Sequence, residues 1–290
     1  MLHRPRRSVL YMPGANQRAL EKARTLAADC LVLDLEDAVA PAMKVTARQQ
    51  IAAAIASGGY GQRELVVRIN GLDSDWAQED IRMVADSAAD ALCMPKVETA
   101  AQVQQVAALL DGAGADASMA IWVMIETPPG VLNAQAIAAA HPRVKVLVMG
   151  TSDLAKELRV PHTPGREGLQ PALGLCVLAA RANGLDILDG VYLDLDDEPG
   201  YVASCEQGRT LGFDGKTLIH PKQVAAANAV FGPDALELDR AGRIIEAWRE
   251  ADAEGKAVVL VDGKLVEILH VEEARRLLAI AEAIAMVDAE

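Results

Sequence analysis

Short apolar segments rich in β-branched residues recur along the chain and alternate with alanine-rich stretches of helical periodicity. The apolar segments cover residues 8–12, 30–35, 65–69, 91–94, 120–125, 144–149, 190–193 and 212–219. Helical patterns include residues 17–28, 77–87, 100–110 and 171–182. Continuous apolar strands joined by helices are typical of a parallel sheet, and repetition of this unit predicts a (β/α)8 TIM barrel, an α/β fold.

An open doubly wound sheet is the alternative fold for this alternating pattern. Such sheets that bind dinucleotides carry a GxGxxG turn after the first strand, whereas this chain has Met-Pro-Gly-Ala at residues 12–15. The pattern therefore favours the barrel.

The pattern changes after residue 219. Residues 221–230 and 235–253 have helical periodicity, residues 256–268 form an expected hairpin turning at Asp262 and Gly263, and residues 271–285 form a final expected helix. A closed barrel cannot accept further strands. We therefore predict a barrel over residues 1–220 and a C-terminal lid or arm over residues 221–290 that reaches a neighbouring subunit.

Composition and charge narrow the function further. The 290 residues are 51% hydrophobic, and 28 basic against 41 acidic residues give a formal charge of −13, which argues against nucleic acid as a partner. No apolar segment reaches the ~20 residues that span a bilayer, and no secretory signal is evident. Four cysteines without CxxC spacing indicate a reduced compartment, so we expect a cytoplasmic protein with no membrane partner.

Acidic side chains stand where two expected strands end, the edge at which TIM barrels carry their active sites. Glu126 follows segment 120–125, and Asp153 follows segment 144–149. Two carboxylates from adjacent strands suit a hard divalent cation, so we predict that Glu126 and Asp153 hold Mg²⁺. The alternative for Asp153 is a helix N-cap.

Other strand ends supply further candidates. Arg68 is costly to bury without an anion, so we expect it to pair with Glu36 or Asp37 and to bind a substrate carboxylate. Glu36 and Asp37 would orient Arg68 and metal-bound water. Gly150, Thr151 and Ser152 are expected to contact the substrate.

Lys96 and His220 raise alternatives. Lys96 at a strand end is a candidate for Schiff-base chemistry, although a structural or solvated lysine is more common. His220 is a candidate general base by residue type, but it follows the last strand and is expected to order a turn.

Ordered motifs run from residue 7 to about residue 284: RSVLYMPGAN, LDLEDAV, VRIN, MPKVE, IETPPGV, GTSDLAKEL, GFDGKTLIHPKQ and DGKLVE. Together they resemble the citrate lyase β-subunit-like branch of the HpcH/HpaI aldolase superfamily, which includes malyl-CoA and citramalyl-CoA lyases. The resemblance implies a trimeric or hexameric barrel, Mg²⁺ on Glu126 and Asp153, and a keto-acid carboxylate on Arg68.

The resemblance also implies that the C-terminal segment closes over the site of an adjacent subunit and delivers an acidic residue. By motif position this residue is Glu267, where many relatives carry Asp. The added methylene displaces the carboxylate by about one C–C bond. Three outcomes stay open: conserved chemistry with a shifted backbone, an altered substrate, or lost lyase activity. Asp262 is a nearby alternative acid, or only a turn residue.

The expected function is Mg²⁺-dependent, reversible Claisen-type cleavage of a carboxylated 3-hydroxyacyl-CoA, such as malyl-CoA or citramalyl-CoA. An active-site base would remove the hydroxyl proton, and Arg68 and the metal would stabilise the oxygen that becomes the ketone. Glu267 would protonate the departing thioester enolate, so that acetyl-CoA and glyoxylate or pyruvate leave. A citrate lyase β-subunit, a malyl-CoA thioesterase and a weakly active CoA- or keto-acid-binding barrel remain alternatives. The acyl group is left open, because one methyl is worth only ~1–3 kcal/mol of discrimination.

Overall fold

The computed structural model describes residues 4–253 and 255–288. Arg6–Phe231 form one compact unit, and the described residues before Arg6 and from Gly232 onward form a second. The boundary expected at residue 220 falls inside the first unit, because α10 (Val224–Phe231) packs against strands β1 and β8 of the barrel.

The first unit is a closed barrel of eight parallel strands in sequential order, with β1 paired to β8. This confirms the predicted (β/α)8 barrel. The strands are β1 (Ser8–Pro13), β2 (Cys30–Asp34), β3 (Glu64–Arg68), β4 (Ala91–Met94), β5 (Ala120–Ile125), β6 (Val144–Met149), β7 (Asp186–Asp189) and β8 (Gly215–Leu218).

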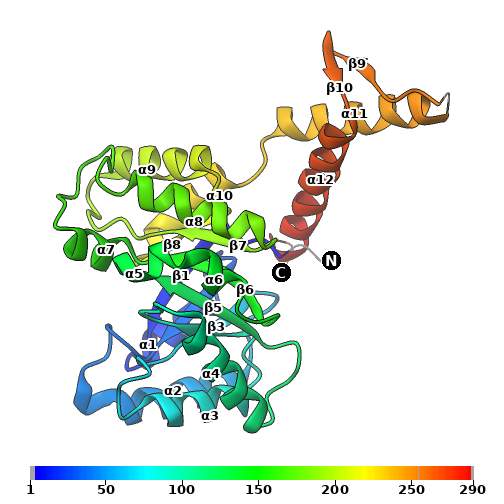
Figure 1. Ribbon diagram of the computed structural model, residues 1–290. Helices are drawn as coiled ribbons and strands as arrows, with labels where there is room; N and C mark the ends of the chain where they lie inside the picture. The colour runs from blue at the N-terminus through cyan, green and yellow to red at the C-terminus, as the bar shows by residue number, and fades with distance from the viewer. Residues whose placement is uncertain (1–3, 254, 289–290) are drawn as a thin grey trace. The chain divides into compact units, whose positions relative to one another are not determined.

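Helices surround these strands, with α2, α3 and α4 on one side of the sheet and α8 and α9 on the opposite side in Figure 1. The remaining helices of this unit are short. The helices are α1 (Gln17–Ala23), η1 (Pro41–Met43), α2 (Lys44–Ser57), α3 (Ala77–Ala85), α4 (Ala100–Gly112), α5 (Pro128–Leu132), α6 (Ala134–Ala138), α7 (Thr151–Leu158), α8 (Gln170–Ala182), α9 (Glu198–Leu211), η2 (Pro221–Gln223) and α10.

Two apolar layers hold the barrel together. Side chains alternate along a strand, so each strand sends one set of residues into the barrel and the other toward the helices. The outer set joins the helices in the main core, while the large ring of Trp122 and mostly small or β-branched residues, Cys30 and Cys93 among them, fill the interior. Both cysteines are buried and neither forms a disulfide.

Strand β7 corrects the prediction from sequence. We expected a strand over residues 190–193 that ends at Asp194, but β7 covers Asp186–Asp189 and Asp194 lies in the following loop. The apolar pattern misled us because the strand carries two charged residues. Buried Asp189 is stabilised by Lys216 Nζ at 2.7 Å and Arg166 Nη1 at 2.6 Å, which offsets the cost of its desolvation.

The second unit contains α11 (Ala235–Ala253), a hairpin of β9 (Val259–Val261) and β10 (Lys264–Val266), and α12 (Ile268–Asp288). Its own core includes Ile244, Trp248 and Val266. The hairpin turns at Asp262 and Gly263, both with positive φ, as predicted.

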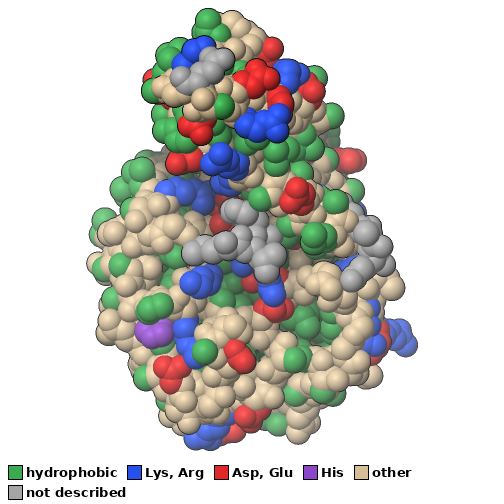
Figure 2. Space-filling model, turned by 90° about the vertical axis from the view of Figure 1, so that its right-hand side faces the viewer, with side chains coloured by type: hydrophobic (Ala, Val, Ile, Leu, Met, Phe, Trp, Pro, Cys, Tyr) green, Lys and Arg blue, Asp and Glu red, His purple; other side chains and the backbone are tan. Residues whose placement is uncertain are grey.

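Acidic and basic side chains are interspersed with apolar ones on the face drawn in Figure 2. Within residues 4–253 and 255–288, none of the helices combines the length and apolar character needed to cross a bilayer.

We expect Lys216→Met to destabilise the barrel by about 3–5 kcal/mol, because Asp189 would lose one of its two buried cations. Chemical denaturation measures this change. The matched control is Lys222→Met, which removes a lysine paired with exposed Asp196 at 3.4 Å and should leave stability nearly unchanged. Equal effects of the two variants would contradict a stabilising role for the buried pair.

Candidate active site

The inward-facing positions change from apolar to charged where the strands reach their carboxyl ends. Asp34, Arg68 and Glu126 each lie two positions beyond a residue of the apolar interior, and therefore on the same face of their strand. The preceding interior residues are Val32, Val66 and Met124. The barrel thus collects these charges at its carboxyl-end mouth, where TIM-barrel active sites are found.

Arg68 and Asp34 form a bidentate ion pair at this mouth. Arg68 Nε donates to Asp34 Oδ1 at 2.7 Å, and Nη2 donates to Oδ2 at 2.6 Å. The backbone N–H groups of Glu36 and Ala38 also donate to the Asp34 carboxylate, at 2.9 and 3.2 Å. Burial opposes the charge on Arg68, but the nearby carboxylates outweigh this effect and raise its pKa. Arg68 is therefore a fixed cation.

Glu36 contacts two cations. Its Oε2 lies 2.8 Å from Arg68 Nη1, and its Oε1 accepts a hydrogen bond from Lys96 Nζ at 2.7 Å. Burial raises the pKa of Glu36, and the two cations offset only part of this shift. Asp37 is more exposed and lies 3.6 Å from Arg68 Nη1. Of the two predicted partners of Arg68, Glu36 is therefore the nearer. The main partner of Arg68 is Asp34, which was not predicted.

Lys44 was also missed by sequence reasoning. Its buried Nζ donates to the carbonyl oxygens of Leu35 and Glu36, both at 2.8 Å, and so holds the segment that carries Glu36. A lysine at the start of a helix ordinarily indicates a solvated surface, so the local sequence contains no signal for this role.

Glu126 is held in place by backbone geometry. Its side chain is buried, and Oε1 accepts the Lys96 backbone N–H at 2.7 Å. Lys96 has a φ of 51°, a left-handed conformation that is unfavourable for lysine. Position 150 requires glycine for a different reason, because a Cβ there would lie 2.4 Å from Glu126 Cβ and Oε2. The glycine therefore leaves the space that the Glu126 carboxylate occupies.

Burial raises the pKa of Glu126 to about 7, and the negative charges of Glu36 and Asp153 add to this shift. Asp153 lies in the first turn of α7, whose N-cap position is Gly150, so the N-cap alternative for Asp153 is wrong. A divalent cation between Glu126 and Asp153 would relieve the repulsion between the two carboxylates. Gly150 makes room for the Glu126 carboxylate, and the oxygen donors of Glu126 and Asp153 fit such an ion.

The described residues contain no group of three or more His, Cys, Asp or Glu side chains placed to hold a metal ion. A cation held by Glu126 and Asp153 would therefore take its other ligands from substrate and water. This sparse protein coordination is common for Mg²⁺.

Lys96 is unsuited to Schiff-base chemistry in this environment. Burial alone would lower its pKa, but the hydrogen bond to Glu36 and the surrounding carboxylates raise it. A Schiff base needs a neutral amine, so these contacts favour the opposite protonation state. The geometry indicates a cation that positions Glu36.

The predicted substrate-binding segment begins α7. Thr151 is buried, and a Cβ at Gly190 would meet its Oγ1 at 2.1 Å, which shows that the Thr151 side chain packs against the end of β7. Ser152 is half-buried. Contact of Gly150, Thr151 or Ser152 with substrate stays a prediction.

The predicted acids of the C-terminal unit lie outside the barrel unit. Glu267 is exposed, and its backbone N–H donates to His270 Nδ1 at 3.1 Å. Asp262 pairs with Arg243 Nη2 at 3.0 Å in the hairpin turn. His220 caps η2 by accepting the Lys222 N–H, which confirms its expected structural role.

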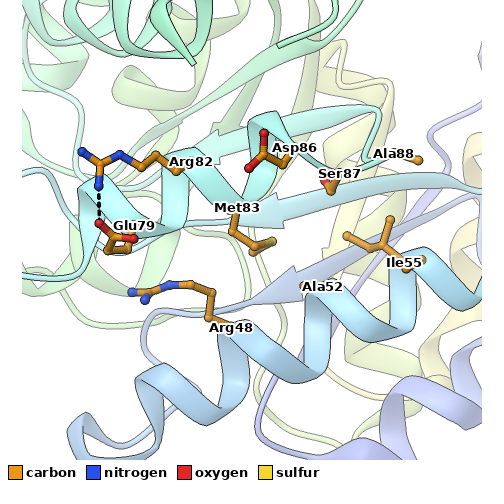
Figure 3. A pocket seen from close by; sticks show the side chains of 10 residues that line it. Arg48, Ala52, Ile55, Glu79, Arg82, Met83, Asp86, Ser87 and Ala88 are labelled. Carbon is orange, nitrogen blue, oxygen red and sulfur yellow. Dashed lines mark hydrogen bonds and ion pairs between the residues drawn. The ribbon is translucent and has the colours of Figure 1, made fainter. Parts of the chain in front are cut away.

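A separate groove of about 670 Å³ lies between α2 and α3 on the outside of the barrel (Figure 3). Its lining includes Arg48, Met83 and the Glu79–Arg82 ion pair drawn in the figure. The lining shares no residue with the carboxylate cluster at the mouth.

This barrel carries its carboxylates and a buried arginine together at the carboxyl-end mouth. Residues 7–221 match the family described as HpcH/HpaI aldolase/citrate lyase. The chain belongs to this family, as its motifs indicated.

A (3S)-malyl-CoA thioesterase of Cereibacter sphaeroides is 52% identical over 281 residues, covering 97% of this chain and 96% of the relative. The citrate lyase subunit beta of Escherichia coli K12 is 35% identical, with coverage of 96% and 94%. The chain also resembles CitE from Mycobacterium tuberculosis in complex with magnesium, acetoacetate and coenzyme A. The TM-score is 0.76 at 28% identity, with coverage of 95% of this chain and 97% of that one.

We expect Glu126→Gln to stabilise the protein at pH 8 by up to about 3 kcal/mol in buffer without divalent cations. The folded pKa of Glu126, about 7, lies above its ordinary value of 4.5, so the folded chain retains a proton that the unfolded chain releases. Stability from this group is therefore present below pH 4.5 and is lost as the pH rises through 7.

Urea unfolding at pH 5 and pH 8 measures this effect. The gain should shrink toward pH 5, and exposed Glu157→Gln should show no comparable pH dependence. A pH-independent effect of Glu126→Gln would show that the Glu126 charge is not the cause.

Gly150→Ala should destabilise the fold by about 1–3 kcal/mol, because the added Cβ overlaps the Glu126 side chain. Thermal unfolding provides the measurement. Gly174→Ala in α8 is the control, because its added Cβ meets nothing within 4 Å and alanine favours a helix. If Gly150→Ala unfolds like the control, the close packing at Glu126 is not required.

Proposed function

We propose that this protein is a Mg²⁺-dependent enzyme that hydrolyses the thioester of a hydroxydicarboxylic acyl-CoA of the (3S)-malyl-CoA type. The observation that carries this choice is the 52% identity to a (3S)-malyl-CoA thioesterase over nearly the whole of both chains. Similarity to citrate lyase beta subunits is lower, at 35% for the Escherichia coli protein. The reaction would consume water and release malate and free coenzyme A.

Glu126 and Asp153 would hold the metal ion. The raised pKa of Glu126 and its placement against Gly150 support this assignment, as does the magnesium in the complex of the related CitE. When bound, Mg²⁺ would supply Lewis-acid polarisation of substrate oxygens. Gly150, Thr151 and Ser152 begin the adjacent helix and would contribute contacts to the acyl group.

Arg68 would bind the free carboxylate of the substrate. Asp34 and Glu36 take only part of its donor capacity, and the ion pair with Asp34 fixes its orientation before substrate arrives. Such preorganisation lowers the ordering cost of binding a carboxylate. The buried setting also strengthens the attraction, because little water competes for the guanidinium.

Glu36 is the proposed proton acceptor. Its raised pKa brings its protonation closer to neutral pH, while Lys96 and Arg68 hold both carboxylate oxygens in place. In hydrolysis Glu36 would take a proton from the attacking water, and Asp37 would help to orient that water. Glu267 from the C-terminal arm of a neighbouring subunit would supply a proton to the departing group, in a homotrimer or hexamer.

Carbon–carbon cleavage of malyl-CoA or citramalyl-CoA is the second candidate function. The family includes citrate lyase subunits, and the fold relative CitE has been crystallised with magnesium and pyruvate, which favours this candidate. In this reaction Glu36 would accept the hydroxyl proton instead of a water proton. The same cluster therefore serves either reaction, and the products decide between them. We further propose a cytoplasmic location, in keeping with a CoA-linked substrate and with cysteines that form no disulfide among the described residues.

Purified protein should release free thiol from (3S)-malyl-CoA in the presence of Mg²⁺ without producing glyoxylate. Separate assays of thiol, glyoxylate and acetyl-CoA measure the outcome. Glyoxylate and acetyl-CoA without thiol would establish the lyase instead, and no product from malyl-CoA or citramalyl-CoA would overturn both functions.

Variants connect this activity to the site. Glu126→Gln should lower turnover by at least about 100-fold at limiting Mg²⁺, while Glu157→Gln should retain it. Unchanged turnover of Glu126→Gln at limiting Mg²⁺ would remove Glu126 from the proposed metal site.

A further inference from the structure

Tyr11 on β1 contributes an aromatic ring to the mouth of the barrel. It packs against the apolar interior but is only partly buried, whereas the interior residues around it are fully buried. The guanidinium carbon of Arg68 lies 4.8 Å from the centre of the Tyr11 ring. Sequence reasoning did not single out this residue, because a tyrosine within an apolar strand is ordinarily a core residue.

The ring adds a contact to Arg68 that is different in kind from those of the carboxylates. Asp34 binds Arg68 along one edge through Nε and Nη2, and Glu36 lies at Nη1. These contacts act at the edges of the planar group, whereas Tyr11 presents the face of its ring to the guanidinium carbon. A desolvated arginine is attracted to an aromatic face by the ring quadrupole, so the ring helps to hold the guanidinium in place.

We infer that Tyr11 is a positioning residue for substrate binding: its ring supports the Arg68 guanidinium and aims the remaining N–H donors at the substrate carboxylate. This inference rests on the proposed role of Arg68 in that function. Tyr11 acts through Arg68 and takes no part in proton transfer.

The hydroxyl group is dispensable for this role. Tyr11 Oη donates to Met124 Sδ at 3.8 Å, and a thioether is a weak acceptor. Arg68 Nη1 donates to the same sulfur at 3.9 Å. Tyr11→Phe should therefore retain the KM and kcat of the natural protein within about two-fold.

Fluorinated phenylalanines at position 11 separate the electrostatics of the ring from its shape. Successive fluorines weaken the negative face of the ring with little change in size. Starting from Tyr11→Phe, mono-, di- and trifluorinated rings should raise KM for malyl-CoA stepwise, by about ten-fold in total, with a smaller change in kcat. Tyr11→Leu, which removes the ring, should raise KM at least as much.

The outcomes distinguish this inference from the proposed function. An active natural protein with a flat KM across the fluorinated series would overturn the role of Tyr11, because packing alone would then explain the ring. A loss in Tyr11→Phe equal to that in Tyr11→Leu would also overturn it, since the hydroxyl would be the working group.

A natural protein inactive on malyl-CoA and citramalyl-CoA would instead refute the proposed function. The contact between Tyr11 and Arg68 is then tested by a double-mutant cycle of Tyr11→Leu and Arg68→Met, in which urea unfolding measures the stability of each variant. Non-additive losses of stability support the ring as the support of Arg68, and additive losses overturn it.

Discussion

The buried charge of Arg68 is the constraint on which the mouth of the barrel depends. A guanidinium at the end of an interior strand face is stable only when anions and donors are arranged around it. Asp34 supplies the bidentate partner, and two backbone N–H groups hold Asp34 in turn. Lys44 then fixes the segment that brings Glu36 to the same cation. One desolvated cation thus orders much of the surrounding site.

The two halves of the site are electrostatically unequal. On the Arg68 side, Asp34 and Glu36 have cationic partners within ion-pair distance. On the other side, Glu126 accepts a backbone N–H, while burial and, to a smaller extent, the charges of Glu36 and Asp153 raise its pKa. Because Glu126 has no such cationic partner among the described residues, a bound divalent cation would stabilise its ionised form. Two local features keep Glu126 in this position. Lys96 adopts an unfavourable left-handed backbone conformation, and Gly150 has no side chain to collide with Glu126.

Charged residues elsewhere in the barrel have a different role. Asp189 and Lys216 lie on the outer faces of β7 and β8, where Arg166 completes a buried ion cluster. Arg6 similarly pairs with Glu64 at 2.7 Å and lies over the ring of Trp122. Charge within a strand is therefore insufficient evidence of catalysis. The chemical role depends on which face carries the charge and which end of the barrel it occupies.

The alternation of apolar strands and helical stretches was enough to predict the barrel, because burial on both faces leaves continuous apolar runs in the sequence. Position at a strand end was likewise enough to select Arg68, Glu36, Glu126 and Asp153 as candidates. The family motifs supported these choices.

Tertiary structure alone decided how the candidates are connected. Asp34, Lys44 and Tyr11 have roles defined by partners from other strands and loops, so their local sequence resembles ordinary turn, surface and core positions. The strand at Asp186–Asp189 was misplaced for the same reason, because its charges are compensated by residues distant in the chain. Hydrophobic periodicity is a local property, whereas the compensation of buried charge is set by contacts that form only when the barrel closes.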